Sequence, residues 1–195
     1  MVGNVLNVPL GGEGNSFRLA DLAPGSWLAE LEFYFPLRFV QDTQVATILA
    51  GAGVLPQGAD LGAVARRIVF GEARGMVRGF MDLVFRHSSR YYLIDWKSNH
   101  LGNRAEDYGP ERLCREMERS LYPLQYLLYT VALDRFLERR LPGYRYEEHF
   151  GGVFYLFLRG IDPERPPLGV YHDLPRPDLV RALTDCLAGR EGGAP

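Results

Sequence analysis

The sequence predicts an α/β domain built on a mixed β-sheet, because segments of two different periods follow one another along the chain. Residues 28–37 alternate apolar and polar side chains, and residues 75–86 and 90–97 are rich in β-branched and aromatic residues, as strands are. Residues 122–140 instead carry apolar side chains at helical spacing and end at Leu141-Pro142-Gly143, a helix stop. Strands and helices mixed in this way favour one sheet with helices packed on it.

The other segments complete this domain. We expect residues 1–27 to be irregular, as the N-terminal edge of a longer chain, and residues 28–190 to form the folded domain. The remaining expected elements are helices at 40–50, 60–70, 111–119 and 177–188, strands at 150–159 and 168–172, and a polar loop at 102–110.

The composition is that of an ordinary globular protein. Of the 195 residues, 47% are hydrophobic and 24% are charged, which suffices for one domain with a core. A net charge of −2 carries no global signature of nucleic-acid binding, although a local basic face remains compatible with it. No apolar run of about 18 residues and no signal peptide are apparent, so we expect a cytoplasmic protein without a membrane partner. Cys114 and Cys186 fit no zinc or redox spacing and should be free thiols.

The polar segment 87–90 (His-Ser-Ser-Arg) lies between two predicted strands and indicates a β-hairpin. If it closes the turn, the numbers of paired residues sum to 177, and Asp82 lies opposite Asp95. Two carboxylates placed in this way repel each other. Either a shared proton or a divalent cation held between them would offset that repulsion, since hard cations prefer carboxylate oxygen.

Lys97 is the only lysine of the chain, beside 21 arginines. It follows Asp95 by two residues and so shares its strand face, whereas Ile94 and Trp96 point the opposite way, into the core. Lysine is a compact point charge and arginine a planar fork, so a lysine kept here indicates a chemical demand for an amine, with chance as the alternative. The alternation therefore predicts two carboxylates and one amine in a single patch.

Further polar residues are candidates on other elements. Glu30 and Glu32 share one face of the strand at 28–37 and are either a third carboxylate of the site or solvated. Gln125 and Tyr129 share one face of the long helix, either beside the site or as a satisfied core pair. Four arginines after the patch could contact backbone phosphates or form a solvated helix face: Arg104, Arg112, Arg115 and Arg119.

Taken together, the segments GFMDL (79–83), DWKSN (95–99) and Gln125-x-x-x-Tyr129 resemble the PD-(D/E)xK nuclease pattern in the form found in the RecB family. The resemblance extends through GFMDLVFRHSSRYYLIDWKSNHLG, LQYLLYTVALDRF and HFGGVFYLFLRG, and it covers most of residues 28–188. It implies a restriction-endonuclease-like fold, with a central mixed sheet flanked by helices. It also implies that residues 28–190 are a nuclease domain of a larger helicase–nuclease, because no Gly-Lys-Ser/Thr phosphate loop occurs here.

Carried over by position, the resemblance implies a metal site and a catalytic amine. Asp82, Asp95 and the backbone carbonyl of Trp96 would bind Mg²⁺, with Mn²⁺ as a substitute, and Lys97 would be the amine. Glu30 matches the first acidic motif of the family better than Glu32 does. The last set, Gln125 and Tyr129, matches the helical motif beside the site.

The resemblance further implies Mg²⁺-dependent hydrolysis of DNA phosphodiester bonds in double-strand-break repair and recombination, with no ATP used by this domain. Its implied partners are DNA, RecC- and RecD-type subunits and the RecA recombinase. The family also places a metal-binding histidine on a helix ahead of the first acidic strand. No histidine precedes Glu30 in this chain, whose histidines are His87, His100, His149 and His172.

Two alternatives follow. A chain that lacks this histidine could have weak or no nuclease activity and act as a protein-interaction module for partner subunits and RecA loading. A different metal-dependent hydrolase is the other reading, against which the Gln125/Tyr129 helix and the single Lys97 argue.

Overall fold

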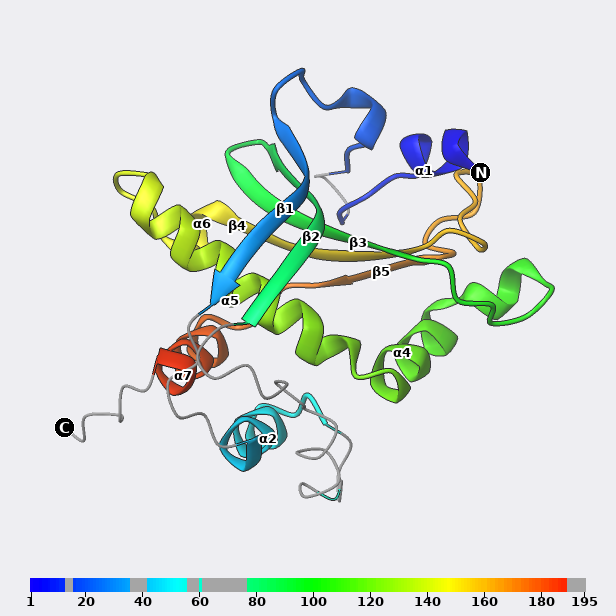
Figure 1. Ribbon diagram of the computed structural model, residues 1–195. Coiled ribbons are helices and arrows are strands. Elements are labelled where there is room, and N and C mark those ends of the chain that lie inside the picture. Colours follow the sequence, from blue (N-terminus) through cyan, green and yellow to red (C-terminus); the bar gives the residue numbers. More distant parts are fainter. Residues whose placement is uncertain (13–15, 36–41, 56–59, 61–76, 189–195) are drawn as a thin grey trace. The chain divides into compact units, whose positions relative to one another are not determined.

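The computed structural model describes residues 1–12, 16–35, 42–55, 60 and 77–188 (Figure 1). It is an α/β fold with one five-stranded sheet, in which the strands are ordered as in the sequence. The strands are β1 (Trp27–Phe35), β2 (Val77–His87), β3 (Arg90–Lys97), β4 (Phe150–Phe157) and β5 (Val170–Asp173). The β3–β4 pair is parallel, while β2–β3 and β4–β5 are antiparallel. The predicted mixed sheet is therefore confirmed.

The helices also follow the predicted pattern. They are α1 (Val2–Asn7), η1 (Leu19–Asp21), α2 (Asp42–Gly51), η2 (Ala105–Tyr108), α4 (Pro110–Arg119), α5 (Tyr122–Arg140), α6 (Tyr146–His149) and α7 (Pro177–Ala188). The helices predicted at 40–50, 111–119, 122–140 and 177–188 are confirmed, and the one predicted at 60–70 falls, beyond Asp60, outside the described residues. Among the helices of the described ranges, none has the length and apolarity of a membrane span.

The expectation of irregular structure over residues 1–27 is partly wrong. This segment contains α1 and η1, and Leu10 and Phe17 form an isolated antiparallel bridge. Its buried apolar residues join a core cluster with side chains of β2, β3 and β4. They are spaced irregularly among Gly and Asn, so they show no helical or strand period even though they are buried. The polar loop predicted at 102–110 likewise contains the short helix η2.

The described chain divides into two compact units. The first comprises Met1–Leu31, Met81–Tyr122 and Tyr144–Leu174, and the second comprises Glu32–Phe80, Pro123–Gly143 and Pro175–Pro195. The first unit contains β3, β4, β5 and α4, and the second contains α2, α5 and α7. The single domain expected over residues 28–190 stays a prediction.

The β2–β3 hairpin has the predicted register. Leu83 pairs with Ile94 and His87 pairs with Arg90, so the paired numbers sum to 177. Ser88 and Ser89 both have positive φ, 48° and 66°. Two such residues form a type I′ turn, whose twist matches that of the flanking strands. The turn thereby sets which residues of β2 and β3 face each other.

One face of β3 lies in the core of the first unit. Tyr92 and Ile94 are buried there with Phe85, Phe154 and residues of the N-terminal segment, and Trp96 packs against this cluster. The rings of Phe85 and Tyr92 stack with centroids 5.1 Å apart. Since side chains alternate along a strand, Asp95 and Lys97 project from the opposite face. The predicted inward direction of Ile94 and Trp96 is confirmed.

The second unit has a core of its own. Helix α2 contacts α7, and both helices bury apolar side chains. In the same unit, a Cβ atom on Gly79 would lie 2.5 Å from the ring of Phe33, so a larger residue where β2 passes this ring would require the ring to shift. Both cysteines are free thiols, as predicted.

Candidate active site

Asp95 and Lys97 form a buried ion pair on the face of β3 opposite the core cluster. Lys97 Nζ lies 2.5 Å from Asp95 Oδ1, and only 7% of the Asp95 side chain and 12% of the Lys97 side chain are exposed. Burial raises the pKa of Asp95, the Lys97 ammonium opposes this change, and the negative charge of Asp82 adds to it. Burying charges is costly, so such a pair is a functional-site candidate.

Asp82 reaches the same place from β2. Its Oδ2 accepts a hydrogen bond of 2.8 Å from the backbone N–H of Trp96, the residue between Asp95 and Lys97. Backbone pairing between β2 and β3 ends at Leu83 and Ile94. One residue beyond Leu83, the Asp82 side chain therefore accepts the hydrogen bond from the backbone N–H of β3. The structure thus brings Asp82, Asp95 and Lys97 together, as the hairpin register predicts.

Two tyrosines enclose the Lys97 ammonium. Its Nζ lies 4.0 Å from the ring centroid of Tyr122 and 4.9 Å from that of Tyr155. An ammonium over an aromatic face is attracted by the ring quadrupole. Sequence reasoning missed both residues. A prediction of the parallel register of β3 and β4 would have identified Tyr155, because Tyr155 pairs directly with Asp95 and so lies on the same face of the sheet.

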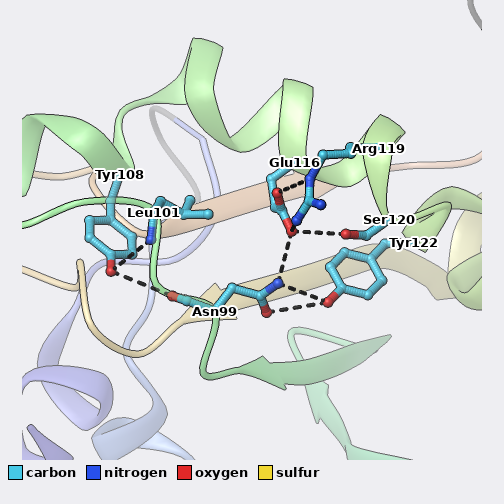
Figure 2. A network of polar contacts seen from close by, with 7 residues as sticks. All are labelled: Asn99, Leu101, Tyr108, Glu116, Arg119, Ser120 and Tyr122. Carbon is cyan, nitrogen blue, oxygen red and sulfur yellow. Dashed lines mark hydrogen bonds and ion pairs between the residues drawn. The ribbon is translucent and has the colours of Figure 1, made fainter.

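A hydrogen-bonded network begins two residues after Lys97 (Figure 2). Asn99 Nδ2 donates to Glu116 Oε1 at 2.8 Å and to Tyr122 Oη at 3.1 Å, and Tyr122 Oη donates to Asn99 Oδ1 at 3.2 Å. Glu116 also accepts from Arg119 and Ser120. These bonds, from Arg119 above all, lower the pKa of Glu116, which is buried.

Sequence reasoning also missed Asn99 and Glu116. Glu116 lies in a helix that the sequence predicts as a charged one, ERLCREMER. Its spacing of three residues from Leu113, next to Met117, is the available signal, since these three side chains form the buried face of α4.

The loop after β3 borders a pocket of ≈ 460 Å³ whose lining includes His100, Arg104 and Arg159. Arg159 Nε donates to the Ser98 carbonyl at 2.9 Å. Within the described ranges, neither Arg104 nor Arg159 forms an ion pair. The other three predicted phosphate contacts are paired with carboxylates: Arg112 with Asp107, Arg115 with Glu111 and Arg119 with Glu116. Arg159, which follows β4, was not predicted from the sequence.

Gln125 and Tyr129 contact each other on α5, as their spacing predicts. Gln125 Nε2 donates to Tyr129 Oη at 2.8 Å, and the Tyr129 ring meets Phe33 edge to face. Both belong to the second unit, whereas Asp82, Asp95 and Lys97 belong to the first. Their predicted position beside the carboxylates stays a prediction.

The two glutamates of β1 differ. Glu32 forms an ion pair with Arg78 and accepts a hydrogen bond from Tyr34 Oη; the Tyr34 bond first, then Arg78, lowers its pKa. Glu30 is exposed and has a φ of 51°. A positive φ interrupts the extended backbone, so the two-residue spacing no longer sets both side chains on one face.

The oxygen atoms available as metal ligands at the hairpin suit a hard cation. The expected ligands are Asp82, Asp95 and the Trp96 carbonyl, and carboxylate and carbonyl oxygens are what Mg²⁺ prefers. The Trp96 N–H engages Asp82 Oδ2, and Lys97 Nζ engages Asp95 Oδ1. Among the described residues, no cluster of three or more His, Cys, Asp or Glu side chains is suited to hold a metal.

Comparison with known proteins gives one consistent result. The chain is 42% identical to the RecBCD enzyme subunit RecB of Escherichia coli K12 over 185 residues, which are 95% of this chain and 15% of that protein. It is 44% identical to RecB of Haemophilus influenzae over 166 residues, 85% of this chain and 13% of that protein. Against RecB of Mycobacterium tuberculosis H37Rv it is 38% identical over 204 residues, with shares of 93% and 18%. No family model matches. The chain spans less than a fifth of the length of these relatives.

Proposed function

The chain belongs to the RecB family as a homologue of one segment of that subunit, and on this premise we propose that it is a metal-dependent nuclease domain acting on DNA. The observation that carries the proposal is the convergence of Asp82 from the middle of β2 with Asp95 and Lys97 at the end of β3. The buried Asp95–Lys97 pair is costly to maintain, which supports a chemical role over a purely structural one.

Asp82, Asp95 and the Trp96 carbonyl are the proposed ligands of Mg²⁺, or of Mn²⁺ in its place. When bound, the cation supplies Lewis acidity at the scissile phosphate and a more acidic attacking water. The Trp96 N–H fixes the Asp82 carboxylate through a bond of 2.8 Å. Burial, with a smaller contribution from the Asp82 charge, raises the pKa of Asp95, and a cation bound to the carboxylate would offset both.

Lys97 is the proposed catalytic amine. Its ammonium orients the attacking water, or offsets charge that develops on the phosphoryl oxygens as the P–O bond breaks. The contacts with Asp95, Tyr122 and Tyr155 hold its Nζ in one place. Such prior placement lowers the cost of reaching the transition state.

The substrate strand is proposed to run along the loop after β3. Arg104 and Arg159 line the pocket there and have no carboxylate partner in the described part of the chain, which leaves their charge to backbone phosphates. Gln125 and Tyr129 are proposed to position the strand or the site, and Glu30 to act as the first acidic residue. ATP has no role in this proposal.

The wider role is proposed on the same premise. As part of a RecBCD-type enzyme, the domain would act in double-strand-break repair and recombination, with RecC- and RecD-type subunits and RecA as partners. The alternative is a protein-interaction module with little nuclease activity.

A cleavage assay tests the proposal. End-labelled linear DNA is incubated with the chain and with a chain extended N-terminally, in Mg²⁺, in Mn²⁺ and in EDTA. The proposal expects metal-dependent cleavage that Asp95→Asn abolishes. If neither folded protein cleaves DNA with either cation, the nuclease proposal is wrong and the interaction module is favoured.

A further inference from the structure

The Lys97 ammonium is enclosed by groups that are held in different ways. Asp95 and Tyr155 face each other in the register of β3 and β4, so the sheet fixes both of them. Tyr122, whose ring is the nearer one at 4.0 Å, is instead the first residue of α5. The preceding residue, Leu121, has a φ of 52°, so the chain turns sharply just before the ring. The ring packs against Tyr155 of β4, with centroids 5.5 Å apart, and its hydroxyl end needs a further restraint.

Asn99 provides that restraint. Its amide and the Tyr122 hydroxyl are joined by two contacts, Nδ2 to Oη at 3.1 Å and Oη to Oδ1 at 3.2 Å (Figure 2). Asn99 follows Lys97 by only two residues. The backbone connects Lys97 to Asn99, whose amide contacts the Tyr122 hydroxyl. The Tyr122 ring lies against the ammonium, so these groups form a closed loop around it.

Glu116 sets the direction of the Asn99 amide. A carboxylate only accepts hydrogen bonds, so the atom that meets Glu116 Oε1 at 2.8 Å must be the NH₂ group. The amide oxygen consequently faces Tyr122 and accepts its hydroxyl proton. Arg119 and Ser120 hold Glu116 in turn, with bonds of 2.8 to 2.9 Å.

We propose that Tyr122 and Asn99 are positioning residues that fix the catalytic amine of Lys97, with Glu116 orienting Asn99. The inference rests on the proposed function, because it assigns a purpose to the placement of Lys97. A lysine side chain has four rotatable bonds, and displacement of a catalytic group by about 1 Å costs about 100-fold in rate. The ring offers the ammonium a fixed attractive surface, and the Asn99 contacts keep that surface in place.

The single lysine allows a direct test that does not depend on nuclease activity. Protein labelled with ¹³C at the lysine side chain gives one lysine Cε–Hε signal, that of Lys97. Ring currents of Tyr122 and Tyr155 should shift this signal upfield from that of a solvated lysine. Tyr122→Leu should remove most of the shift. Tyr122→Phe, which keeps the ring but loses the hydroxyl, and Asn99→Ala should each remove part of it.

The Tyr122→Phe/Asn99→Ala double variant should shift the signal no further than the stronger single variant, since both substitutions break the same contact. Arg115→Ala is the matched control, because Arg115 lies on the same helix as Glu116 but pairs with Glu111, outside the network. Its signal should match wild type. Thermal melts confirm folding, and Tyr122→Phe carries the test if Asn99→Ala does not fold. A wild-type signal in folded Tyr122→Phe and Asn99→Ala overturns the proposal.

Kinetics on DNA supply the second readout. Asn99→Ala and Tyr122→Phe should lower kcat about 10- to 100-fold while KM changes less than about three-fold, because placement acts in the transition state. Tyr122→Leu should lose more than Tyr122→Phe. A moved lysine signal with unchanged kcat overturns the proposal. If neither the chain nor its N-terminally extended form cleaves DNA, the proposed function is refuted, whereas the signal of Lys97 still decides whether Asn99 and Tyr122 position the amine.

Discussion

The two faces of β3 accommodate burial in opposite ways. Ile94 and Asp95 are neighbours with nearly equal exposure, 2% and 5%. Ile94 packs among aromatic and aliphatic side chains, which stabilises the fold by about 1.5–3 kcal/mol. Asp95 forms an ion pair with Lys97. Their mutual attraction offsets only part of the free energy that desolvation of the two charges costs. Stability of the fold alone therefore does not explain the residues on this face of β3.

On the charged face, Lys97→Arg should cause the largest loss of DNA cleavage. The amine lies between Asp95 and two rings, and a planar guanidinium cannot occupy the same point. Cleavage should fall about 1000-fold, the upper range for the loss of a group that stabilises developing charge. Initial rates on linear DNA measure this loss, and circular dichroism checks the fold. Full activity in the folded variant would remove the role assigned to the amine.

Ile94→Ala should break the apolar face and spare the chemistry. It removes a side chain from a packed cluster, which costs about 2–5 kcal/mol in the free energy of unfolding. Urea denaturation measures that cost. The rate per folded molecule should stay within about three-fold of wild type; a loss as large as that of Lys97→Arg would mean that the two faces are not separable.

The two faces of β3 also show which parts of the fold and of the site can be predicted from the sequence. Strong periods and the turn at 87–90 predict the five strands, the helices α2, α4, α5 and α7, and the hairpin register, because each signal is local. The register in turn predicts the gathering of Asp82, Asp95 and Lys97. These parts of the fold and the site follow from neighbours along the chain or across one turn.

The rest depends on contacts between distant segments. Tyr122 and Asn99 meet across 23 residues, and Asn99 and Glu116 across 17. The irregular spacing of the N-terminal apolar residues shows no period, although they are buried. The positive φ of Glu30 is likewise invisible in an alternating strand pattern. Period and spacing carry no information about such contacts or about one residue's backbone angle.

Asp82→Asn sharpens the comparison within the charged face. Metal affinity should fall at least about ten-fold, or about 1.4 kcal/mol, because one anionic ligand is lost. The metal-free fold should become slightly more stable, by less than about 1 kcal/mol, because repulsion with Asp95 is relieved while an amide oxygen can still accept the Trp96 N–H. Titration calorimetry with Mg²⁺ and denaturation in EDTA measure both; unchanged metal affinity would contradict the assigned ligand.

Arg159→Ala and Arg104→Ala extend the test to the pocket after β3. Each should weaken DNA binding in EDTA and lower the dependence of log affinity on log salt by about one unit of slope. Arg115→Ala is the matched control, since this exposed arginine pairs with Glu111. Fluorescence anisotropy over a salt series gives the slopes. Slopes equal to wild type in both pocket variants would exclude the proposed phosphate contacts.

The smallest expected effect is a pH dependence of stability at Glu116. Bonds from Arg119, Ser120 and Asn99 lower its pKa in the folded state. A carboxyl with a lowered folded pKa adds stability that is fully present above its unfolded pKa, about 4.3, and that is lost as the pH falls through the folded value. The melting temperature of wild type should therefore drop more steeply below about pH 5 than that of Glu116→Gln, which does not titrate. Parallel curves for the two proteins would mean that the carboxylate is not held by its partners in solution, and the orientation of Asn99 would then need another cause.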